Sequence, residues 1–278
     1  MIRILAYAKL NLSLDVLSRR ADGYHEIESL VQRIDLADQI TMRRSKGRLV
    51  VENDMDIPSE GDLAWLAARL LLDKKRSQMG LEVRVQKSIP AGAGLGGGSS
   101  DAAAVLWAAN ILTPPVISAD RLTELSRELG SDVPLFLHGG LVRVTGRGEK
   151  VDRVLPCRQE SFVVVIPPIH CDTALVYNQM KPKPSSGKGY VEQSELGHND
   201  LYDAAVSLYP RLAYYKQAIA HANGSYGGMS GSGSAFYVAF DDRGDAVLAR
   251  DDLEAELPEA KVFLSRGVSV GFEARGEE

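Results

Sequence analysis

The feature that most constrains this chain is a glycine-rich segment, KSIPAGAGLGGGSSDAAA, at residues 87–104. Five glycines lie between Gly92 and Gly98. The alternating pattern of Leu81–Val85 predicts a strand before the segment, and the alanine-rich stretch Ser100–Leu112 predicts a buried helix after it. Clustered glycine between a strand and a helix indicates backbone that must turn tightly or approach another group closely.

A loop of this kind is suited to binding phosphate. Its backbone N–H groups converge with those of the helix N-terminus, and the helix dipole favours negative charge there. A tight turn, or a helix packed on a sheet, would need only one or two of these glycines. We therefore expect residues 92–100 to hold a phosphate group.

The type of phosphate site is narrowed by what surrounds the glycines. No Gly-Lys-Ser/Thr follows, which excludes a Walker A loop. Gly92, Gly94 and Gly97 do fit G-x-G-x-x-G, the dinucleotide pattern. The acidic residue that such a site needs would be Asp120 or Glu124, and both fall at the start of a predicted helix instead of a strand end. A dinucleotide site is therefore disfavoured.

Composition sets limits on partners and location. The 278 residues carry a net charge of −5, which disfavours binding to a nucleic-acid backbone. No apolar run is long enough to span a membrane. The two cysteines form neither a CxxC pair nor a disulfide framework, and the first residues show no secretion signal. We expect a cytoplasmic protein without a nucleic-acid or membrane partner.

The order of predicted elements favours an α+β fold. Leu10–Val16 alternates as a half-buried strand, and Phe162–Ile166 is an apolar run typical of a buried strand. Apolar residues at helical spacing predict one helix over Leu63–Leu71 and another over Leu122–Leu129. The second has Ser118 as its expected N-cap and Gly130 as its expected C-cap. Strands and helices do not alternate strictly, as they would in a doubly wound sheet. The turn-rich residues 146–150 predict two domains, 1–152 and 153–278.

Two charged residues have unusual sequence surroundings. Lys9 lies within the apolar segment YAKLNL, where a cation needs a partner unless it sits on an exposed edge. Asp132, in GSDVP, is either a functional carboxylate or the N-cap of a helix that starts at Pro134. The five histidines show no metal-ligand spacing, and the serines of the glycine loop lack the G-x-S-x-G pattern of a nucleophile.

Taken together, three segments resemble the signatures of the GHMP kinase superfamily. They are the N-terminal strand AYAKLNL at 6–12, the loop PAGAGLGGGSS at 90–100 and the small-residue loop SGSGSAFY at 230–237. Ala6 and Tyr7 replace the usual small residue and proline of the first signature. The resemblance implies a two-domain α+β fold with the active site in the cleft between the domains.

Further segments are similar to one branch of this superfamily, the kinases that act on cytidine diphosphate methylerythritol. They are RRADGYHEIESLVQRIDLAD at 19–38, LGSDVPLFL at 129–137 and SRGVSV at 265–270. The resemblance implies ATP-dependent phosphorylation of a 2-hydroxyl group on that small-molecule substrate, in non-mevalonate isoprenoid precursor synthesis. Mg²⁺ is expected with the nucleotide, and its protein ligands stay unassigned apart from Ser100 as a candidate.

The resemblance also implies roles for individual residues. Asp132 matches the catalytic aspartate and Lys9 the lysine that partners it. The substrate is expected to contact Asn11 and, at the cytosine, Tyr24, His25 and Tyr177. The expected ATP-binding residues are Lys87, Pro90, Ala91, Gly92, Ala93, Gly94, Leu95, Gly96, Gly97, Gly98, Ser99 and Ser100.

Other functions stay open at this point. One is a GHMP kinase for homoserine, a mevalonate derivative or a sugar, which the Gly23–His25 segment disfavours. Another is a non-catalytic nucleotide sensor, which the intact Lys9 and Asp132 disfavour; a third is an NAD(P)-dependent oxidoreductase. Asp62 stands where the family often has Asn near the adenine. The oligomeric state is not predicted.

Overall fold

The structure, a computed structural model, describes residues 1–54, 61–154, 157–180 and 196–276. Its elements in chain order are β1 (Ile2–Arg19), β2 (His25–Ser45), β3 (Leu49–Asn53), α1 (Leu63–Lys74), β4 (Gly80–Gln86), α2 (Gly97–Leu112), α3 (Ala119–Ser126), α4 (Val133–Leu137), β5 (Leu141–Gly146), β6 (Lys150–Val154), β7 (Ser161–Ile166), α5 (Thr173–Gln179), α6 (Tyr202–Leu208), α7 (Leu212–His221), β8 (Tyr226–Met229), β9 (Phe236–Phe240), α8 (Arg243–Glu256), β10 (Lys261–Val268) and β11 (Phe272–Gly276).

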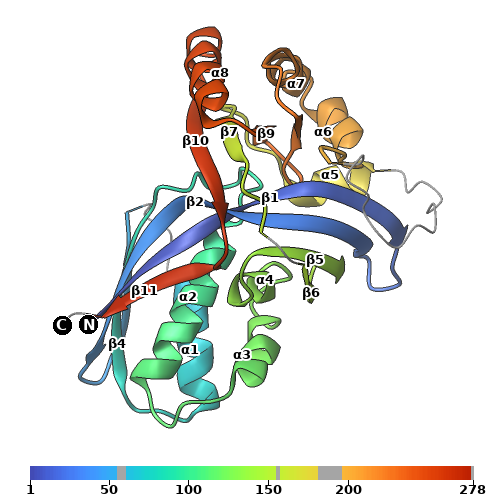
Figure 1. Cartoon of the computed structure of the whole chain (residues 1–278). Helices are drawn as coiled ribbons and strands as arrows, with labels where there is room; N and C mark the ends of the chain where they lie inside the picture. Colours follow the sequence, from blue (N-terminus) through green and yellow to red (C-terminus); the bar gives the residue numbers. More distant parts are fainter. Residues whose placement is uncertain (55–60, 155–156, 181–195, 277–278) are drawn as a thin grey trace.

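Two long antiparallel strands, β1 and β2, cross the molecule (Figure 1). Leu10 and Leu12 of β1 are buried in an apolar cluster, as their alternation predicts, so that Lys9 and Asn11 point to the opposite face. Strand β2 pairs with β5 along its first half and with β4 along its second half. Register shifts interrupt the β1–β2 ladder beside Ala8 and between Asn11 and Ser13. Such bulges re-aim side chains, here next to the polar face of β1.

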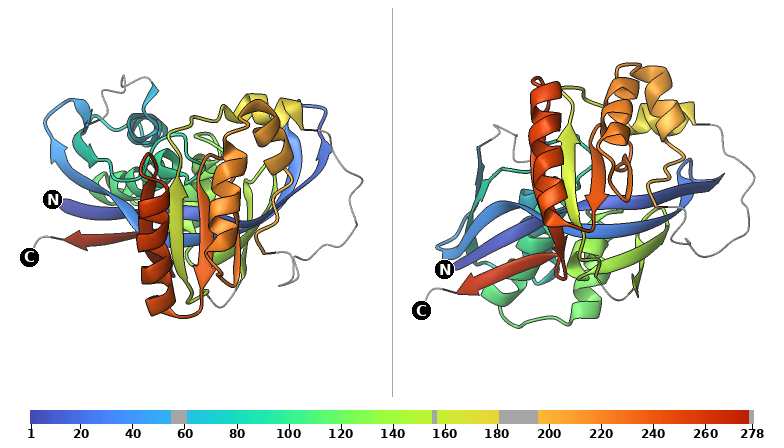
Figure 2. Two further views of the ribbon diagram at one scale, coloured as in Figure 1. Left: turned by 90° about the horizontal axis from the view of Figure 1, so that it is seen from above. Right: turned by 45° about the horizontal axis from the view of Figure 1, so that its top comes forward.

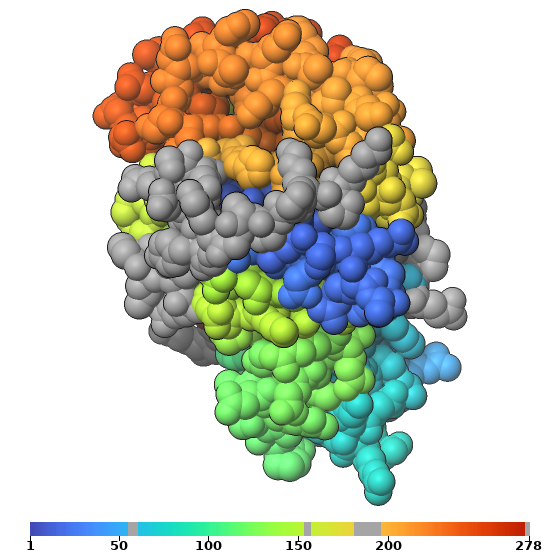
Figure 3. Space-filling view, turned by 90° about the vertical axis from the view of Figure 1, so that its right-hand side faces the viewer, coloured from blue at the N-terminus to red at the C-terminus, as the bar shows by residue number. Residues whose placement is uncertain are grey.

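Helices pack on both sides of these two strands. Helices α1, α2, α3 and α4 lie below them in Figure 1, and α5, α6, α7 and α8 lie above with β7, β8 and β9. One apolar core joins α1–α4 to the sheet, and a second joins α5–α8 to β7 and β9. The space-filling view shows the tip of the β1–β2 hairpin, in blue, between these two groups (Figure 3). The fold is α+β, as expected.

The last two strands connect the two halves of the molecule. Strand β10 pairs with β7 over Lys261–Arg266 and then with β2 at Gly267 and Val268. Strand β11 pairs with β1, so the end of the described chain lies beside its beginning (Figure 2). The boundary at residue 152 stays a prediction, although the pairing of β11 with β1 places part of 153–278 in the N-terminal sheet.

Helix α3 illustrates where local prediction succeeds and fails. Ser118 is its N-cap, as predicted, and its side chain accepts a hydrogen bond from the N–H of Arg121. The helix ends at Ser126, however, and not near Gly130. From Arg127 to Leu129 each N–H bonds to the carbonyl three residues back, which tightens the last turn before the glycine. Among the described residues, no helix is both long and apolar enough to cross a membrane.

Candidate active site

A cavity of about 740 Å³ is lined by nine of the eighteen predicted site residues. It lies where the polar face of β1, the glycine loop, the start of α4 and helix α5 meet. Its walls include Lys9, Asn11, Tyr24, His25, Gly94, Gly96, Ser99, Asp132 and Tyr177. Residues more than 160 positions apart in the sequence, such as Lys9 and Tyr177, therefore line the same cavity.

Lys9 and Asp132 form the charged centre of this cavity. Lys9 Nζ lies 3.9 Å from Asp132 Oδ2, and the two side chains are 5% and 41% exposed respectively. Burial lowers the pKa of Lys9, while the Asp132 carboxylate acts in the opposite direction. The alternative that Lys9 is an exposed edge residue is wrong, since the ammonium group is buried against its partner.

Asn11 holds the lysine from the other side. Its Oδ1 accepts a hydrogen bond from Lys9 Nζ. Its Nδ2 donates to Ser29 Oγ at 2.7 Å, and its backbone N–H donates to Ser230 Oγ at 3.2 Å. These contacts fix which end of the amide faces the lysine. Asn11 therefore orients the ammonium group.

Asp132 stands at the N-cap position of α4, but its side chain makes no capping hydrogen bond. Its backbone is in the right-handed helical region (φ −84°, ψ −13°) instead of the extended region typical of a capping residue. The alternative that Asp132 serves as a helix cap is therefore wrong. The carboxylate faces the cavity and the lysine.

The glycine loop is held by hydrogen bonds from two distant segments. Lys9 N–H donates to the carbonyl of Leu95 at 2.9 Å. The side chain of Ser230 donates to the carbonyl of Gly94, and Ala235 N–H to that of Ala93, both at 3.0 Å. The segments at 6–12, 90–100 and 230–237 thus form one hydrogen-bonded unit.

The glycines of the loop serve different purposes. Gly92, Gly94 and Gly96 have φ between +68° and +76°, a region that favours glycine. A Cβ on Gly94 would meet the Ser230 carbonyl at 2.2 Å, and one on Gly96 would meet the Phe136 ring at 2.9 Å. The close approach at these two positions is therefore to protein atoms. Gly98 lies in the first turn of α2. Of the described residues, apart from its chain neighbours and the backbone of its own helix, it has only the Leu63 side chain within 4 Å of its Cβ position.

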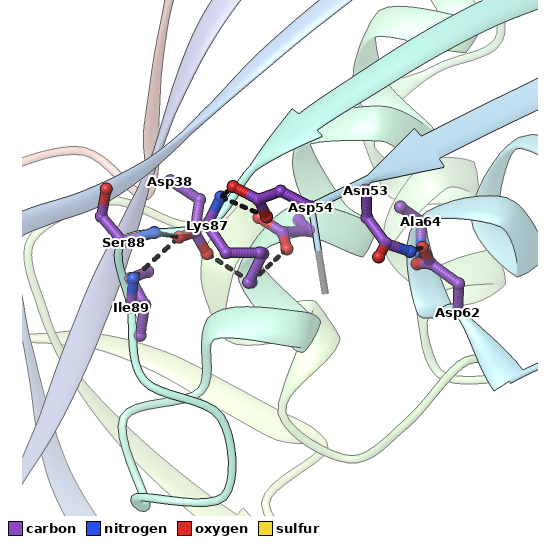
Figure 4. A network of polar contacts seen from close by, with 9 residues as sticks. Asp38, Asn53, Asp54, Asp62, Ala64, Lys87, Ser88 and Ile89 are labelled. Atoms are coloured by element: carbon purple, nitrogen blue, oxygen red, sulfur yellow. Dashed lines mark hydrogen bonds and ion pairs between the residues drawn. The ribbon is translucent and has the colours of Figure 1, made fainter. Parts of the chain in front are cut away.

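Lys87, an expected nucleotide contact, lies at the start of the glycine loop and outside the walls of the cavity. Its ammonium group forms ion pairs with the buried carboxylates of Asp38 and Asp101, the latter at 2.6 Å. Asp38 also accepts hydrogen bonds from the N–H groups of Ser88 and Ile89 (Figure 4). In this geometry Lys87 ties the start of the loop to β2 and α2, and its contact with the nucleotide stays a prediction.

The other loop residues predicted to bind ATP lie outside the walls of the cavity. Pro90, Ala91, Gly92, Ala93 and Leu95 precede α2, whereas Gly97, Gly98 and Ser100 belong to its first turn. Ala93 and Leu95 are buried in the core. Asp62, which stands where the family often has Asn, caps α1 by accepting from Ala64 N–H at 2.8 Å (Figure 4).

Two buried oxygen atoms at the start of α2 are of the kind that Mg²⁺ prefers. Ser100 Oγ and Asp101 Oδ1 have no hydrogen-bond partner within the described parts of the chain. Mg²⁺ takes hydroxyl and carboxylate oxygens, usually few from the protein. Burial raises the pKa of Asp101, and Lys87 acts against this shift. The donor chemistry beside the glycine loop therefore fits the expected metal.

Aromatic residues form the far end of the cavity. His25 and Tyr177 stack on each other with ring centroids 5.3 Å apart and planes 29° apart. His25 is buried, whereas Tyr24 is 55% exposed and lies under the guanidinium group of Arg147, 4.7 Å from the ring centroid. The Tyr24 ring therefore keeps a face open to solvent.

Sequence reasoning missed three polar residues that line this end: Arg147, Thr173 and Asn178. In the sequence the turn at 146–150 predicts a domain boundary, and only the fold places Arg147 in the wall of the cavity. Thr173 and Asn178 flank Tyr177 on α5, and only the fold brings that helix to the cavity.

Comparisons with known proteins agree with this geometry. Residues 62–140 match the family model described as the GHMP kinases N terminal domain, and residues 192–259 match the GHMP kinases C terminal model. The solved structure of a homoserine kinase from Cytophaga hutchinsonii shares the fold, with a TM-score of 0.73 at 17% identity over 99% of this chain and 97% of that one.

Similarity to one group of kinases is closer. A 4-diphosphocytidyl-2-C-methyl-D-erythritol kinase from Pelotomaculum thermopropionicum is 38% identical over 85% of this chain and 88% of its own length. The corresponding enzyme from Citrifermentans bemidjiense is 35% identical over 96% and 98%. A crystal structure of 4-(cytidine 5'-diphospho)-2C-methyl-D-erythritol kinase superposes with a TM-score of 0.83 at 33% identity, covering 97% and 99% of the two chains. The chain therefore belongs to the 4-diphosphocytidyl-2-C-methyl-D-erythritol kinase family of the GHMP kinases.

Proposed function

We propose that this chain transfers the γ-phosphoryl group of ATP to the 2-hydroxyl group of 4-diphosphocytidyl-2-C-methyl-D-erythritol. The observation that carries the proposal is the Lys9–Asp132 pair, 3.9 Å apart, in one cavity with the glycine loop and with the aromatic end. The names of the relatives support the choice of substrate.

The chemistry follows from the charged centre. Phosphoryl transfer needs positioning and charge neutralisation more than covalent help. Asp132 accepts the proton of the attacking hydroxyl group, since its carboxylate faces the cavity and is not used as a cap. Lys9, oriented by Asn11 and 3.9 Å from the carboxylate, neutralises negative charge that develops during the transfer.

The glycine loop and the N-terminus of α2 bind the phosphates of ATP. The N–H groups of Gly97, Gly98 and Ser99 precede the first helical hydrogen bond of α2, which Ser100 N–H makes to the Gly96 carbonyl, and the dipole favours anions there. Ser99 lines the cavity at this point, and Gly98 leaves room for close approach. Mg²⁺ bound beside Ser100 would neutralise phosphate charge.

The opposite end of the cavity recognises cytidine diphosphate. Tyr24 and Tyr177 offer ring faces on which a base can stack, and His25 offers a ring nitrogen for hydrogen bonding. Arg147 lies over the Tyr24 ring, where its guanidinium group can meet a phosphate of the substrate.

Substrate-dependent consumption of ATP tests the proposal. The panel holds the cytidine substrate, methylerythritol phosphate without the cytidine group, homoserine and mevalonate. We expect turnover with the cytidine substrate only. Turnover with homoserine or mevalonate instead would assign the chain to another GHMP kinase activity, and ATP binding without turnover on any substrate would favour a nucleotide sensor.

Three further expectations accompany this proposal: a domain boundary, a cellular location and the kind of partner. We propose a domain boundary near residue 152, with the cavity between the two domains. A cytoplasmic location follows from the reducing environment that two unpaired cysteines suit. The substrate is a small molecule, and the negative net charge disfavours a nucleic-acid partner.

A further inference from the structure

Arg33, in the middle of β2, is the largest fully buried side chain of the described residues. Its relative exposure is 0%, and no carboxylate is among its hydrogen-bond partners. Burying a cation is costly unless its N–H groups are well bonded. The groups that bond to Arg33 therefore indicate which part of the fold the buried guanidinium group stabilises.

Three of the four partners of Arg33 are backbone carbonyls at one place in the fold, and the fourth is the carbonyl of Val31 in β2 itself, at 3.4 Å. The guanidinium group donates to the carbonyls of Leu135, of His138 and, at 2.8 Å, of Gly140. Leu135 lies within α4, and His138 and Gly140 follow its C-terminus. The last carbonyls of a helix lack partners within the helix, and a cation beside them is favourable. Arg33 thus caps the C-terminal end of α4.

The N-terminal end of the same short helix carries Asp132. Helix α4 has only five residues, so its backbone hydrogen bonds alone fix its position weakly. Its Phe136 ring lies against Gly96 of the glycine loop. On another side, Gly271 brings the backbone of the β10–β11 connection so close that a Cβ there would lie 1.8 Å from the Phe136 carbonyl. Helix α4 is therefore confined on these sides, and Arg33 sets its position relative to β2.

We propose that Arg33 is a positioning residue for Asp132, acting through helix α4. This inference rests on the proposed function, in which Asp132 accepts the proton of the substrate. Lys9 is in β1, which pairs directly with β2 at Arg33. The buried guanidinium group therefore fixes the helix that bears the carboxylate relative to the strand pair that bears the lysine.

The test uses the full-length chain with Arg33→Lys and Arg33→Met, and Met42→Ala as a control. Met42 is a fully buried residue of the same strand that packs in the core on the other half of β2. In Arg33→Met we expect kcat to fall about ten- to hundredfold, because small misplacements of a reacting group have effects of this size. Both KM values should stay within about twofold, because neither binding surface is altered. Arg33→Lys, which keeps a cation near the carbonyls, should recover part of kcat.

A merely structural role gives a different pattern. Met42→Ala should lower the melting temperature and leave kcat at 25 °C unchanged. The same pattern in both Arg33 variants would overturn the inference. If Arg33→Met does not fold, Arg33→Lys decides: reduced kcat with unchanged KM supports positioning, and unchanged kcat overturns it.

Amide hydrogen exchange separates this inference from the proposed function. Residues 132–138 should exchange faster in Arg33→Lys than in wild type, and at the wild-type rate in Met42→Ala. Wild type and Asp132→Asn are assayed alongside. If the wild type does not phosphorylate the cytidine substrate, the proposed function fails, while exchange at 132–138 still tests whether Arg33 fixes α4. Unchanged exchange in Arg33→Lys would overturn the inference by itself.

Discussion

Asp132 and Lys9 carry opposite charges in unequal surroundings. The lysine is almost fully buried, whereas the carboxylate is 41% exposed, and both line the cavity. An accessible base next to a buried, oriented cation suits proton abstraction from a bound hydroxyl group. The lone cation within YAKLNL was a usable signal in the sequence, because a buried lysine needs such a partner.

Asp132→Asn should reduce kcat about 10²–10⁴-fold, the usual loss for a positioned base. Removal of a true N-cap residue would instead reduce stability by about 1 kcal/mol. Because Asp132 makes no capping hydrogen bond, any fall in the melting temperature should come from loss of the anion beside the buried Lys9 and should accompany the loss of kcat. Steady-state kinetics and thermal unfolding of the same preparation measure both effects. Preserved turnover with a lower melting temperature would contradict the assignment.

Substitution of Lys87 tests whether this residue stabilises the fold or contacts the nucleotide. Lys87→Met leaves the buried carboxylates of Asp38 and Asp101 without their cation. Breaking a buried ion pair typically reduces stability by about 3–5 kcal/mol. We therefore expect a large fall in the midpoint of urea unfolding. Arg84→Met, at an exposed ion pair of β4, should change it little. An unchanged midpoint with a raised KM for ATP would mark Lys87 as a nucleotide contact.

The alternation of apolar residues and the clustering of glycines predicted the elements that border the cavity. The strand at Leu10–Val16, the glycine loop and helix α2 are found where the patterns place them. A strand after His25 was a candidate, but the 21-residue extent of β2 was not predicted, because its neighbours β1, β4, β5 and β10 surround it and bury polar residues such as Gln32 and Arg33. A strand buried on both faces has no period-two signal, and partners that bond buried polar groups are set by tertiary structure.

The glycine loop gives a prediction in which stability and binding respond differently. Gly98→Ala adds a methyl group in the first turn of α2, where only Leu63, at 3.5 Å, is near. Because Gly98 has no left-handed φ, stability should stay equal or rise by about 0.4–1 kcal/mol. The methyl group lies where phosphate approaches the helix, so the KM for ATP should rise while that for the cytidine substrate does not.

Gly96→Ala is the matched control for this experiment. Its φ of +72° and its contact with Phe136 should make the variant less stable than the wild type. Thermal unfolding and KM for each substrate are measured for both variants. A folded Gly98→Ala protein with wild-type ATP affinity would remove the first turn of α2 from the phosphate site.

At the scale of the whole molecule, the cavity depends on contacts that no local pattern encodes. Its walls come from β1, the glycine loop, α4 and α5, and hydrogen bonds from Ser230 and Ala235 join the loop to the last third of the chain. Sequence motifs could name most of these residues through family resemblance. They could not show that Tyr177 stacks on His25, because that contact follows from how α5 packs beside the hairpin tip.

This arrangement predicts how ligands stabilise the protein. A ligand that binds only the folded state adds about 2.7 kcal/mol at one hundred times its Kd. Cytidine diphosphate should raise the melting temperature by contacting Tyr24, His25 and Tyr177, and a non-hydrolysable ATP analogue should do so through the glycine loop. The two ligands touch opposite ends of one cavity, so a side chain at the aromatic end should affect only the first.

Tyr177→Ala should therefore lose most of the melting-temperature shift caused by cytidine diphosphate and keep the shift caused by the ATP analogue. Stacking of a base on an aromatic ring contributes about 1–3 kcal/mol, which is roughly a five- to hundredfold change in Kd. Tyr214→Ala is the matched control, since Tyr214 is an exposed tyrosine of α7 that lies outside the cavity. It should keep both shifts. Equal loss of both shifts in Tyr177→Ala would mean that the ring supports the fold of the cavity as a whole, and an unchanged cytidine diphosphate shift would place the cytosine elsewhere.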